Sequence, residues 1–129
     1  MKKKNTLLLF LCLFSLWAVA QEKKPVKIAC VGNSITYGSG IKNQFQNSYP
    51  GLLSQLLGEG YDVRNFGISA RVLLNKGDHP YMHEQKFRDL LAFQPDIVTI
   101  KLGTNDSKPW NWRYGKDFKK DLTEMLDIL

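Results

Sequence analysis

The chain has 129 residues, of which 43% are hydrophobic and 23% are charged. These values are close to the average for globular proteins, so they exclude a disordered, collagen-like or disulfide-dense chain. The length allows one domain at most. The formal net charge of +6 includes three lysines at positions 2–4, and without them it falls to +3, which is too small a surplus to indicate a nucleic-acid-binding protein.

The first 20 residues have the order of a secretory signal peptide. The basic residues Lys2–Lys4 precede an apolar run, Leu7–Val19, and the segment ends in Ala-Val-Ala, with small residues where a signal peptidase cuts. A membrane-spanning helix needs about 20 apolar residues, which is more than this run provides. We therefore expect cleavage before Gln21, a secreted or periplasmic product of residues 21–129, and no membrane contact after cleavage.

Cysteine usage in the expected product is minimal. Cleavage removes Cys12 and leaves Cys30 as the single thiol, so the product can form no intrachain disulfide. Cys30 lies between Ala29 and Val31. This apolar setting favours a buried, unreactive cysteine.

Short apolar runs and helical patterns alternate along the rest of the chain. The runs are rich in β-branched residues and end at or near glycines, which is typical of strands. The longer segments carry leucine or phenylalanine at helical spacing, with Pro or Gly at their ends. In chain order the sequence predicts a strand at Val26–Val31, a helix at Ser48–Leu57, a strand at Tyr61–Asn65, a helix at His83–Ala92, a strand at Asp96–Leu102 and a helix from Phe118 to Leu129.

This alternation predicts an α/β domain with a parallel sheet rather than a sandwich or a helix bundle. The third strand is unusual, because Thr99 and Lys101 alternate with apolar residues where a central parallel strand is normally apolar on both faces. Either one face of this strand is thinly covered, or the stem of Lys101 runs along the sheet and its amine emerges at the rim.

Ser34, Gly67 and Asn105 each lie in a polar, glycine-containing turn that follows a predicted strand. They are 33 and 38 residues apart, close to the length of about 30 or more residues expected for one strand–helix–strand unit. Parallel strands end at the same edge of a sheet, which is where open α/β sheets bind their ligands. We therefore expect the three turns to meet at one edge.

The residue types in these turns suit attack on an ester. A serine hydroxyl on a tight turn can act as a nucleophile, and backbone N–H groups and an asparagine amide can stabilise the oxyanion that forms. In this interpretation Ser34 is the nucleophile. The oxyanion donors are its own N–H, the N–H of Gly67 and the side chain of Asn105.

The same turns resemble the sequence blocks of the SGNH, or GDSL-type, esterases: GNSIT at 32–36, NFGISA at 65–70 and GTND at 103–106. The stretches Ile28–Gly40 and Asp96–Trp110 look most like the sialate O-acetylesterase-like branch of that family. The resemblance implies a three-layer, flavodoxin-like parallel sheet. It also implies hydrolysis of O-acetyl esters on carbohydrates such as sialic acids, through an acyl-serine intermediate and without a metal or organic cofactor.

Two departures from the family pattern matter. Asn33 stands where the family name has aspartate, and no aspartate is followed three residues later by histidine, so the D-x-x-H block that supplies the general base is missing. We therefore expect residues 21–129 to be the N-terminal part of an SGNH hydrolase domain, truncated after about three strands. We expect this part to have little or no activity by itself and to leave a sheet edge unpaired.

His79 and His83 are the only histidines in the chain and could serve as a base or as a zinc pair. Pro80 between them and the lack of a third ligand disfavour zinc, and Asp78 and Glu84 are more simply interpreted as solvated loop charges. A surface or capping role fits both histidines better than a role as base.

The aromatic residues Trp110, Trp112 and Tyr114 follow the asparagine block, and they fit either partial core packing or a sugar-stacking wall. A surface role is the simpler interpretation of Arg71, although it could meet an anionic substrate. The charges Lys116, Asp117, Lys119, Lys120 and Asp121 have the pattern of a solvated helix face.

Two other functions compete with ester hydrolysis. The same sheet edge could hold a sugar without cutting it, as a non-catalytic carbohydrate-binding or pseudoenzyme remnant. A small flavodoxin-like binder of flavin or nucleotide is the other alternative, but the segment Gly32–Gly40 lacks the order of a phosphate loop.

Overall fold

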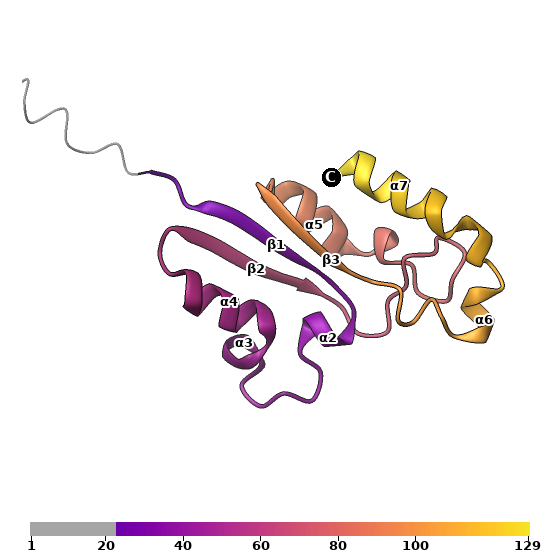
Figure 1. Cartoon of the computed structure of the whole chain (residues 1–129), viewed down its shortest axis with the longest axis horizontal. Helices are drawn as coiled ribbons and strands as arrows, with labels where there is room; N and C mark the ends of the chain where they lie inside the picture. Colours follow the sequence, from indigo (N-terminus) through magenta and orange to yellow (C-terminus); the bar gives the residue numbers. More distant parts are fainter. Residues whose placement is uncertain (1–22) are drawn as a thin grey trace, which may run out of the picture.

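The computed structural model describes residues 23–129, so the predicted signal peptide, its cleavage site and Cys12 lie outside the described residues. Strands and helices alternate along the described chain (Figure 1). In chain order the elements are β1 (Val26–Gly32), α2 (Ser34–Tyr37), α3 (Gln44–Asn47), α4 (Tyr49–Leu57), β2 (Tyr61–Gly67), η1 (Tyr81–His83), α5 (Gln85–Phe93), β3 (Ile97–Lys101), α6 (Pro109–Trp112), η2 (Gly115–Asp117) and α7 (Phe118–Ile128).

The three strands form one parallel sheet in the order β2-β1-β3. Helices α2, α3 and α4 lie on one side of the sheet, and α5 and α7 lie on the other (Figure 1). Each strand is therefore joined to the next by a crossover that contains a helix, as parallel pairing requires. This arrangement confirms the predicted α/β class with a parallel sheet of three strands.

The main core lies between the sheet and the α5–α7 side. Phe66 at the end of β2 and Phe93 at the end of α5 are in contact, with ring centroids 5.6 Å apart. Tyr81 is fully buried beside them, and its hydroxyl donates to the Phe66 carbonyl at 2.6 Å. The buried members of this cluster are Ala29, Val31, Phe66, Leu73, Tyr81, Phe87, Leu90, Phe93 and Met125.

β3 is covered on one face only. Val98 and Ile100 pack against the core, whereas Ile97, Thr99 and Lys101 on the opposite face are exposed. The first of the two explanations for the alternating pattern is therefore right: one face of this strand is thinly covered. The hydroxyl of Tyr49 at the start of α4 reaches Thr99 Oγ1 at 3.4 Å and is the only side-chain hydrogen bond to this face of β3 in the described chain.

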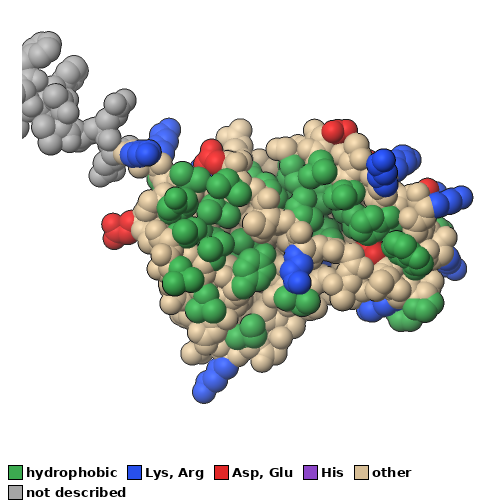
Figure 2. All heavy atoms as spheres, in the orientation of Figure 1, with side chains coloured by type: hydrophobic (Ala, Val, Ile, Leu, Met, Phe, Trp, Pro, Cys, Tyr) green, Lys and Arg blue, Asp and Glu red, His purple; other side chains and the backbone are tan. Residues whose placement is uncertain are grey.

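Apolar side chains are correspondingly abundant on the surface. Ile97 on β3 is 46% exposed and Leu56 on α4 is 83% exposed. Figure 2 shows apolar side chains spread over a broad area of the face seen there, across the sheet and towards α7. Within the described residues the outer edge of β3 has no partner strand, as expected from the sequence.

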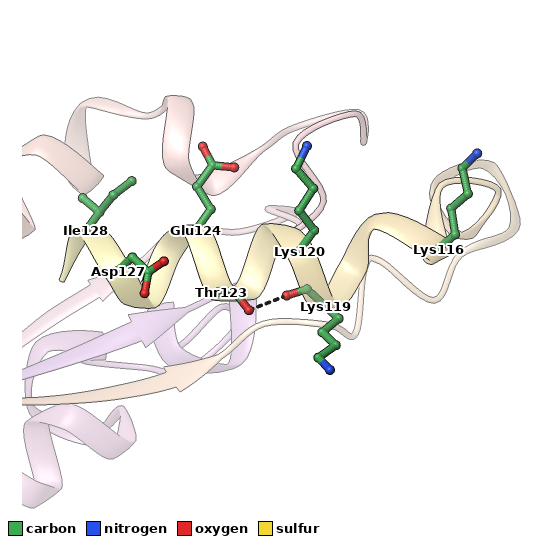
Figure 3. Close-up of a pocket in the computed structure, with 7 residues that line it drawn as sticks. All are labelled: Lys116, Lys119, Lys120, Thr123, Glu124, Asp127 and Ile128. Atoms are coloured by element: carbon green, nitrogen blue, oxygen red, sulfur yellow. Dashed lines mark hydrogen bonds between the residues drawn. The ribbon is translucent and has the colours of Figure 1, made fainter.

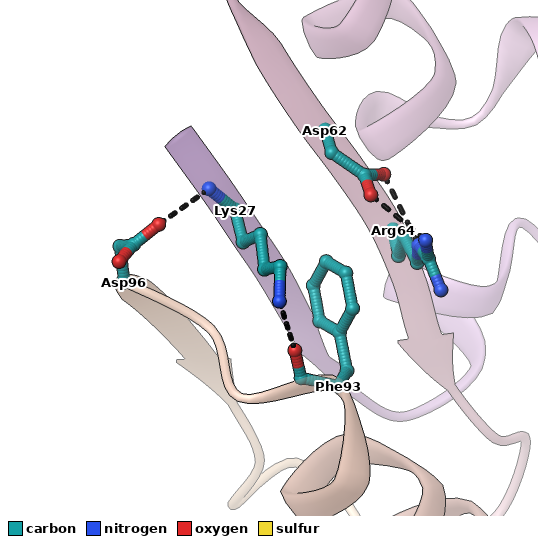
Figure 4. A network of polar contacts seen from close by, with 5 residues as sticks. All are labelled: Lys27, Asp62, Arg64, Phe93 and Asp96. Atoms are coloured by element: carbon teal, nitrogen blue, oxygen red, sulfur yellow. Dashed lines mark hydrogen bonds and ion pairs between the residues drawn. The ribbon is translucent and has the colours of Figure 1, made fainter. Parts of the chain in front are cut away.

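The amino-terminal end of the sheet is tied together by polar contacts (Figure 4). The backbone N–H of Lys27 donates to Asp96 Oδ2 at 2.8 Å, and the Lys27 amine donates to the Phe93 carbonyl at 3.0 Å. Arg64 is held by Asp62 and lies over the Phe93 ring, 4.2 Å from its centroid. These charges are at the opposite end of the strands from Ser34, so they support the fold rather than the candidate site.

The structure corrects several boundaries. Both β1 and β2 extend to a glycine, Gly32 and Gly67, whereas the sequence-based strands stop earlier. The short helices α2 and α3 were not predicted, because four residues are too few to show a helical period. The buried, free Cys30 is confirmed, and no helix among residues 23–129 is both long and apolar enough to cross a membrane.

The predicted solvated face of the last helix is partly wrong. Lys116, Lys119 and Lys120 are not buried, as expected. Asp121, however, is 4% exposed, and its Oδ2 accepts the backbone N–H of Asn75 at 2.8 Å. This carboxylate points inward because it satisfies a loop N–H that has no other partner in the described chain.

Candidate functional site

Ser34 is placed by the junction between β1 and α2. The strand ends at Gly32, and Asn33 caps the short helix that follows by accepting the Ile35 N–H at 3.3 Å. Ser34 is the first residue of that helix and is partly exposed. The first N–H groups of a helix have no acceptor within it. Neither the N–H nor the hydroxyl of Ser34 has a hydrogen-bond partner among the described residues, so both are available at this edge.

The end of β2 lies directly against α2. Gly67 pairs with Gly32 in the parallel register, and the N–H of Ile68 donates to the Gly32 carbonyl at 3.0 Å. A Cβ atom on Gly67 would collide with the backbone nitrogen of Tyr37 and the carbonyl carbon of Thr36. Glycine is therefore required here for close approach, which brings the second turn beside the helix that begins with Ser34.

The third turn follows β3 at the same edge, because Gly32 also pairs with Lys101. The side-chain amide of Asn105 donates to the Arg71 carbonyl at 3.1 Å, and Arg71 lies just beyond the second turn. The prediction that the three polar turns meet at one sheet edge is thus confirmed by register and contact.

The N–H of Gly67 has an acceptor within the protein. It donates to Asn65 Oδ1 at 2.8 Å, while the Asn65 amide nitrogen donates to the Thr36 carbonyl at 2.8 Å. Asn65 therefore fastens the second turn to α2. The role of Gly67 as an oxyanion donor stays a prediction, and that role requires its N–H to leave Asn65.

Ala70, three residues further on, has backbone dihedral φ of 67°, in the left-handed region that non-glycine residues rarely adopt. It is exposed, and its N–H has no acceptor among the described residues. Its neighbours on both sides are held: Ser69 Oγ bonds Ser39 Oγ at 2.6 Å, and Arg71 accepts from Asn105. Sequence reasoning missed this position, since left-handed backbone in alanine leaves no sequence signal.

Asn105 is positioned from both of its ends. Its side chain is bonded to Arg71, the residue as a whole is 9% exposed, and its backbone carbonyl accepts the amide of the buried Asn111 at 3.0 Å. An asparagine amide nitrogen carries two hydrogens. One is used by Arg71, so the second is available to a ligand.

Asp106 directly follows Asn105 in this turn, and its side chain is completely buried. Its Oδ1 accepts the N–H groups of Leu73 and Leu74, each at 2.8 Å, and its Oδ2 accepts the N–H of Gly103 at 3.0 Å. Sequence reasoning assigned Asp106 no role of its own. It joins the loop after β2 to the loop after β3, and so fixes the surroundings of Asn105.

Asp78 is exposed, as expected of a solvated loop charge, but it also belongs to the same support. Its Oδ2 accepts the indole N–H of Trp110 and its Oδ1 accepts the Asn111 amide, both at 3.1 Å. Partial desolvation opposes ionisation, but these hydrogen bonds hold the pKa of Asp78 below its ordinary value. Trp110 and Trp112 remain about half exposed, at 54% and 53%.

Arg71 and Glu84 pair with each other. The guanidinium is 2.8 Å from Glu84 Oε1 and also donates to the Ser69 carbonyl at 3.0 Å. Glu84 is therefore not simply a solvated loop charge, and Arg71 braces the turn that contains Ala70. His79 and His83 are exposed, and neither imidazole makes a hydrogen bond within residues 23–129. The described residues also contain no cluster of three or more His, Cys, Asp or Glu side chains suited to a metal ion.

One surface hollow lies along α7 and is lined by side chains of that helix and Lys116. Figure 3 shows that these side chains point to different sides of the helix, with Lys120 and Glu124 on one side and Lys119 and Asp127 on another. Opposite charges alternate there and no group of them converges, so we assign this surface no binding role.

Comparison with known proteins identifies the family. Residues 30–129 match the model of the GDSL-like Lipase/Acylhydrolase family. The chain belongs to this family. Within it, the chain is 54% identical over 110 residues to an acetylxylan esterase of Xylanibacter ruminicola, a match that covers 85% of this chain and 23% of that protein.

Solved structures of the family have the same fold. AlinE4, an SGNH-hydrolase family esterase, superposes with a TM-score of 0.58 over 81% of this chain and 52% of that chain, at 23% identity. The D162A mutant of the same esterase gives the same values. The chain therefore spans about half the length of these esterases and less than a quarter of the length of the acetylxylan esterase. The sialate O-acetylesterase branch suggested by the sequence stays a prediction.

Proposed function

We propose that this chain carries the nucleophile and the oxyanion donors of an ester hydrolase that removes acetyl groups from carbohydrates. The observation that supports this most strongly is the shared sheet edge: Ser34 begins a helix there, and Asn105 is held beside the neighbouring turn. Its side-chain amide donates to the Arg71 carbonyl, and its backbone carbonyl accepts from Asn111. Family membership supports ester hydrolysis. The relative whose printed name is acetylxylan esterase supports an acetylated polysaccharide as the substrate class, with sialic acid esters as the alternative that the sequence suggests.

In the proposed reaction the Ser34 hydroxyl attacks the carbonyl carbon of the acetyl ester and loses its proton to a general base. The negative charge that develops on the carbonyl oxygen is stabilised by the free hydrogen of the Asn105 amide and by the N–H of Ser34. The sugar hydroxyl leaves with a proton, and water then releases acetate from the acetyl-serine.

A third donor can come from either of two backbone groups. The N–H of Gly67 is the one expected from the sequence, but it donates to Asn65 Oδ1. The N–H of Ala70 has no acceptor among the described residues and lies one residue before the carbonyl that Asn105 binds. We therefore infer that Ala70 is the better third donor.

We propose that the general base lies outside residues 23–129. His79 and His83 are exposed and bond to nothing in the described residues. We propose that the base is a histidine of a D-x-x-H block in a longer protein. We also propose that this protein is exported through residues 1–20 to the periplasm or the cell exterior.

A direct test needs no complete catalytic cycle. The chain is incubated with p-nitrophenyl acetate and free imidazole as a substitute base, and acetylation of the peptide that contains Ser34 is measured by mass spectrometry. We expect the acetyl group on Ser34, none at this peptide in S34A, and a rate lowered by a factor of about 10² in N105A, as for loss of one oxyanion donor. The exposed Ser107 provides the matched control, S107A, which should react like the unsubstituted chain.

Acetylation that is equal in the unsubstituted chain and N105A would contradict the assigned oxyanion site. If Ser34 is never acetylated while the chain still binds sugar, the non-catalytic carbohydrate-binding interpretation replaces this proposal.

A further inference from the structure

Two adjoining hollows lie between β2 and the helices α3 and α4. The smaller has a volume of about 130 Å³ and the larger about 550 Å³. Phe45 and Asn65 line both, so the hollows adjoin, and together we call them the β2 groove. Tyr37 lines the smaller hollow and Arg64 lines the larger one.

The near end of the β2 groove is close to the proposed nucleophile. Tyr37 is the last residue of α2 and Ser34 is the first, so they are three residues apart, a rise of about 4.5 Å along a helix. The Gln44 amide donates to the Tyr37 carbonyl and so joins α3 to the end of α2. The smaller hollow, which Tyr37 lines, is therefore the part of the groove nearest to Ser34 along the chain.

The side chains of the groove suit a polysaccharide. Phe45 is 91% exposed and Tyr37 is 39% exposed, which leaves two aromatic rings available for stacking on sugar rings. The Gln55 amide also lines the groove and is already held, because it donates to the Gln46 carbonyl at 2.8 Å, whereas both ends of the Asn65 amide are used within the protein. Amides that are ordered before binding lose little entropy when they bind sugar hydroxyl groups.

The charge of the groove selects among polysaccharides. Its charged lining residues are Arg64 and Lys86, and no aspartate or glutamate lines either hollow. Arg64 is paired with Asp62 at 2.8 Å, and its guanidinium lies over the Phe93 ring on the α5 side of the sheet, so its charge is not available to a ligand in the groove. Lys86 makes no ion pair within residues 23–129, so its charge is available to an anionic ligand at the Tyr37 end of the groove.

We propose that the β2 groove binds the polysaccharide chain next to the acetylated sugar, with Phe45 stacking on a sugar ring and Lys86 binding the carboxylate of a uronic acid branch. This rests on the proposed function for its substrate class, but it assigns a binding surface and a charge preference that ester hydrolysis alone does not require.

The test is isothermal titration calorimetry of the chain with short, unacetylated xylo-oligosaccharides that carry or lack a glucuronic acid branch. We expect tighter binding of the acidic ligand by about 2- to 5-fold, the range of an exposed ion pair. F45A should weaken binding of both ligands about tenfold, and F45W should restore it, because any aromatic ring can stack. K86Q should remove the preference for the acidic ligand and leave the neutral ligand unaffected.

Matched controls come from outside the groove. Leu56 is 83% exposed on α4 and Lys119 is exposed on α7, and neither lines either hollow, so L56A and K119Q should bind both ligands like the unsubstituted chain. Phe45 is almost fully exposed, so F45A should keep the circular dichroism spectrum of the folded chain. Absence of binding by the folded chain, or equal weakening by F45A and L56A, overturns the groove proposal.

The two proposals fail separately. Calorimetry uses unacetylated ligands and can be repeated with S34A, so it does not depend on the nucleophile. Binding without acetylation of Ser34 removes only the hydrolase proposal, whereas acetylation of Ser34 without oligosaccharide binding removes only the groove.

Discussion

Replacement of Asp106 by asparagine tests whether a buried carboxylate holds the candidate site together. Asp106 is completely buried and accepts three backbone N–H groups, from Leu73, Leu74 and Gly103. Asparagine has the same shape, but one of its two terminal atoms is a donor. At least one of the three N–H groups must therefore lose its acceptor and face another N–H.

The expected cost follows from these contacts. The least disruptive orientation of the substituted asparagine keeps its oxygen on Leu73 and Leu74 and loses only the bond to Gly103. A hydrogen bond to a charged acceptor contributes about 1.5–3 kcal/mol, and the two remaining bonds weaken when the charge is removed. We therefore expect D106N to lower the free energy of unfolding by about 2–4 kcal/mol, a large share of the roughly 5–15 kcal/mol typical of a domain.

Urea unfolding followed by tryptophan fluorescence measures this change, because Trp110 bonds to Asp78, which in turn bonds to Asn111 beside the Asp106 turn. The matched control is D89N: Asp89 is exposed and accepts only the Gln85 amide, so its free energy of unfolding should change by less than about 0.5 kcal/mol. If D106N changes the free energy of unfolding no more than D89N does, the three hydrogen bonds do not hold the loops, and the argument for a fixed Asn105 fails.

Three further predictions concern the same region. Burial raises the pKa of Tyr81, so its hydroxyl keeps its proton in the folded chain at pH values where the unfolded chain loses it. The resulting contribution to folding stability is present below about pH 10 and is lost as the pH rises above it. Y81F should therefore flatten the decline of the urea midpoint at alkaline pH, whereas Y61F, at an exposed tyrosine, should leave that decline unchanged. A70G should raise the free energy of unfolding by about 0.5–1 kcal/mol, and the thermal midpoint with it, because glycine relieves the left-handed backbone at φ 67°. The control A92G, within α5, should lower the thermal midpoint. A lower midpoint in A70G would refute the backbone strain. G67A should destabilise the chain by more than about 2 kcal/mol in urea unfolding, because its Cβ meets the Tyr37 backbone, whereas G60A, with open space around it, should be nearly neutral, and similar midpoints for the two would refute the close approach.

The sequence predicts the sheet and the edge where its polar turns meet, because both depend on short-range patterns. Apolar runs that end at glycine locate β1 and β2 to within two residues, and polar residues after each strand locate the edge where Ser34 and Asn105 lie. The buried state of Cys30 follows from its apolar neighbours in the same way.

The sequence does not predict how that edge is held, because the partners are backbone groups far along the chain. Asp106 binds the N–H groups of Leu73 and Leu74, 33 and 32 residues away, and Asp121 binds that of Asn75, 46 residues away. A backbone N–H has no letter in the sequence, so neither acid shows its buried role there. The engaged N–H of Gly67 was missed although its acceptor, the Asn65 side chain, is only two residues away, because the sequence does not show which way that side chain turns.

The loop from Arg71 to Asn75 connects these observations into one physical argument. Its side chains Val72, Leu73 and Leu74 are buried, although the segment is neither helix nor strand, so its N–H groups need acceptors from elsewhere. Asp106 and Asp121 supply them for Leu73, Leu74 and Asn75, and the Val72 N–H donates to the His79 carbonyl at 3.0 Å. Because the carbonyl of Arg71 at the start of this loop orients the Asn105 amide, the position of the proposed oxyanion donor depends on the same buried carboxylates that allow an irregular segment to enter the core.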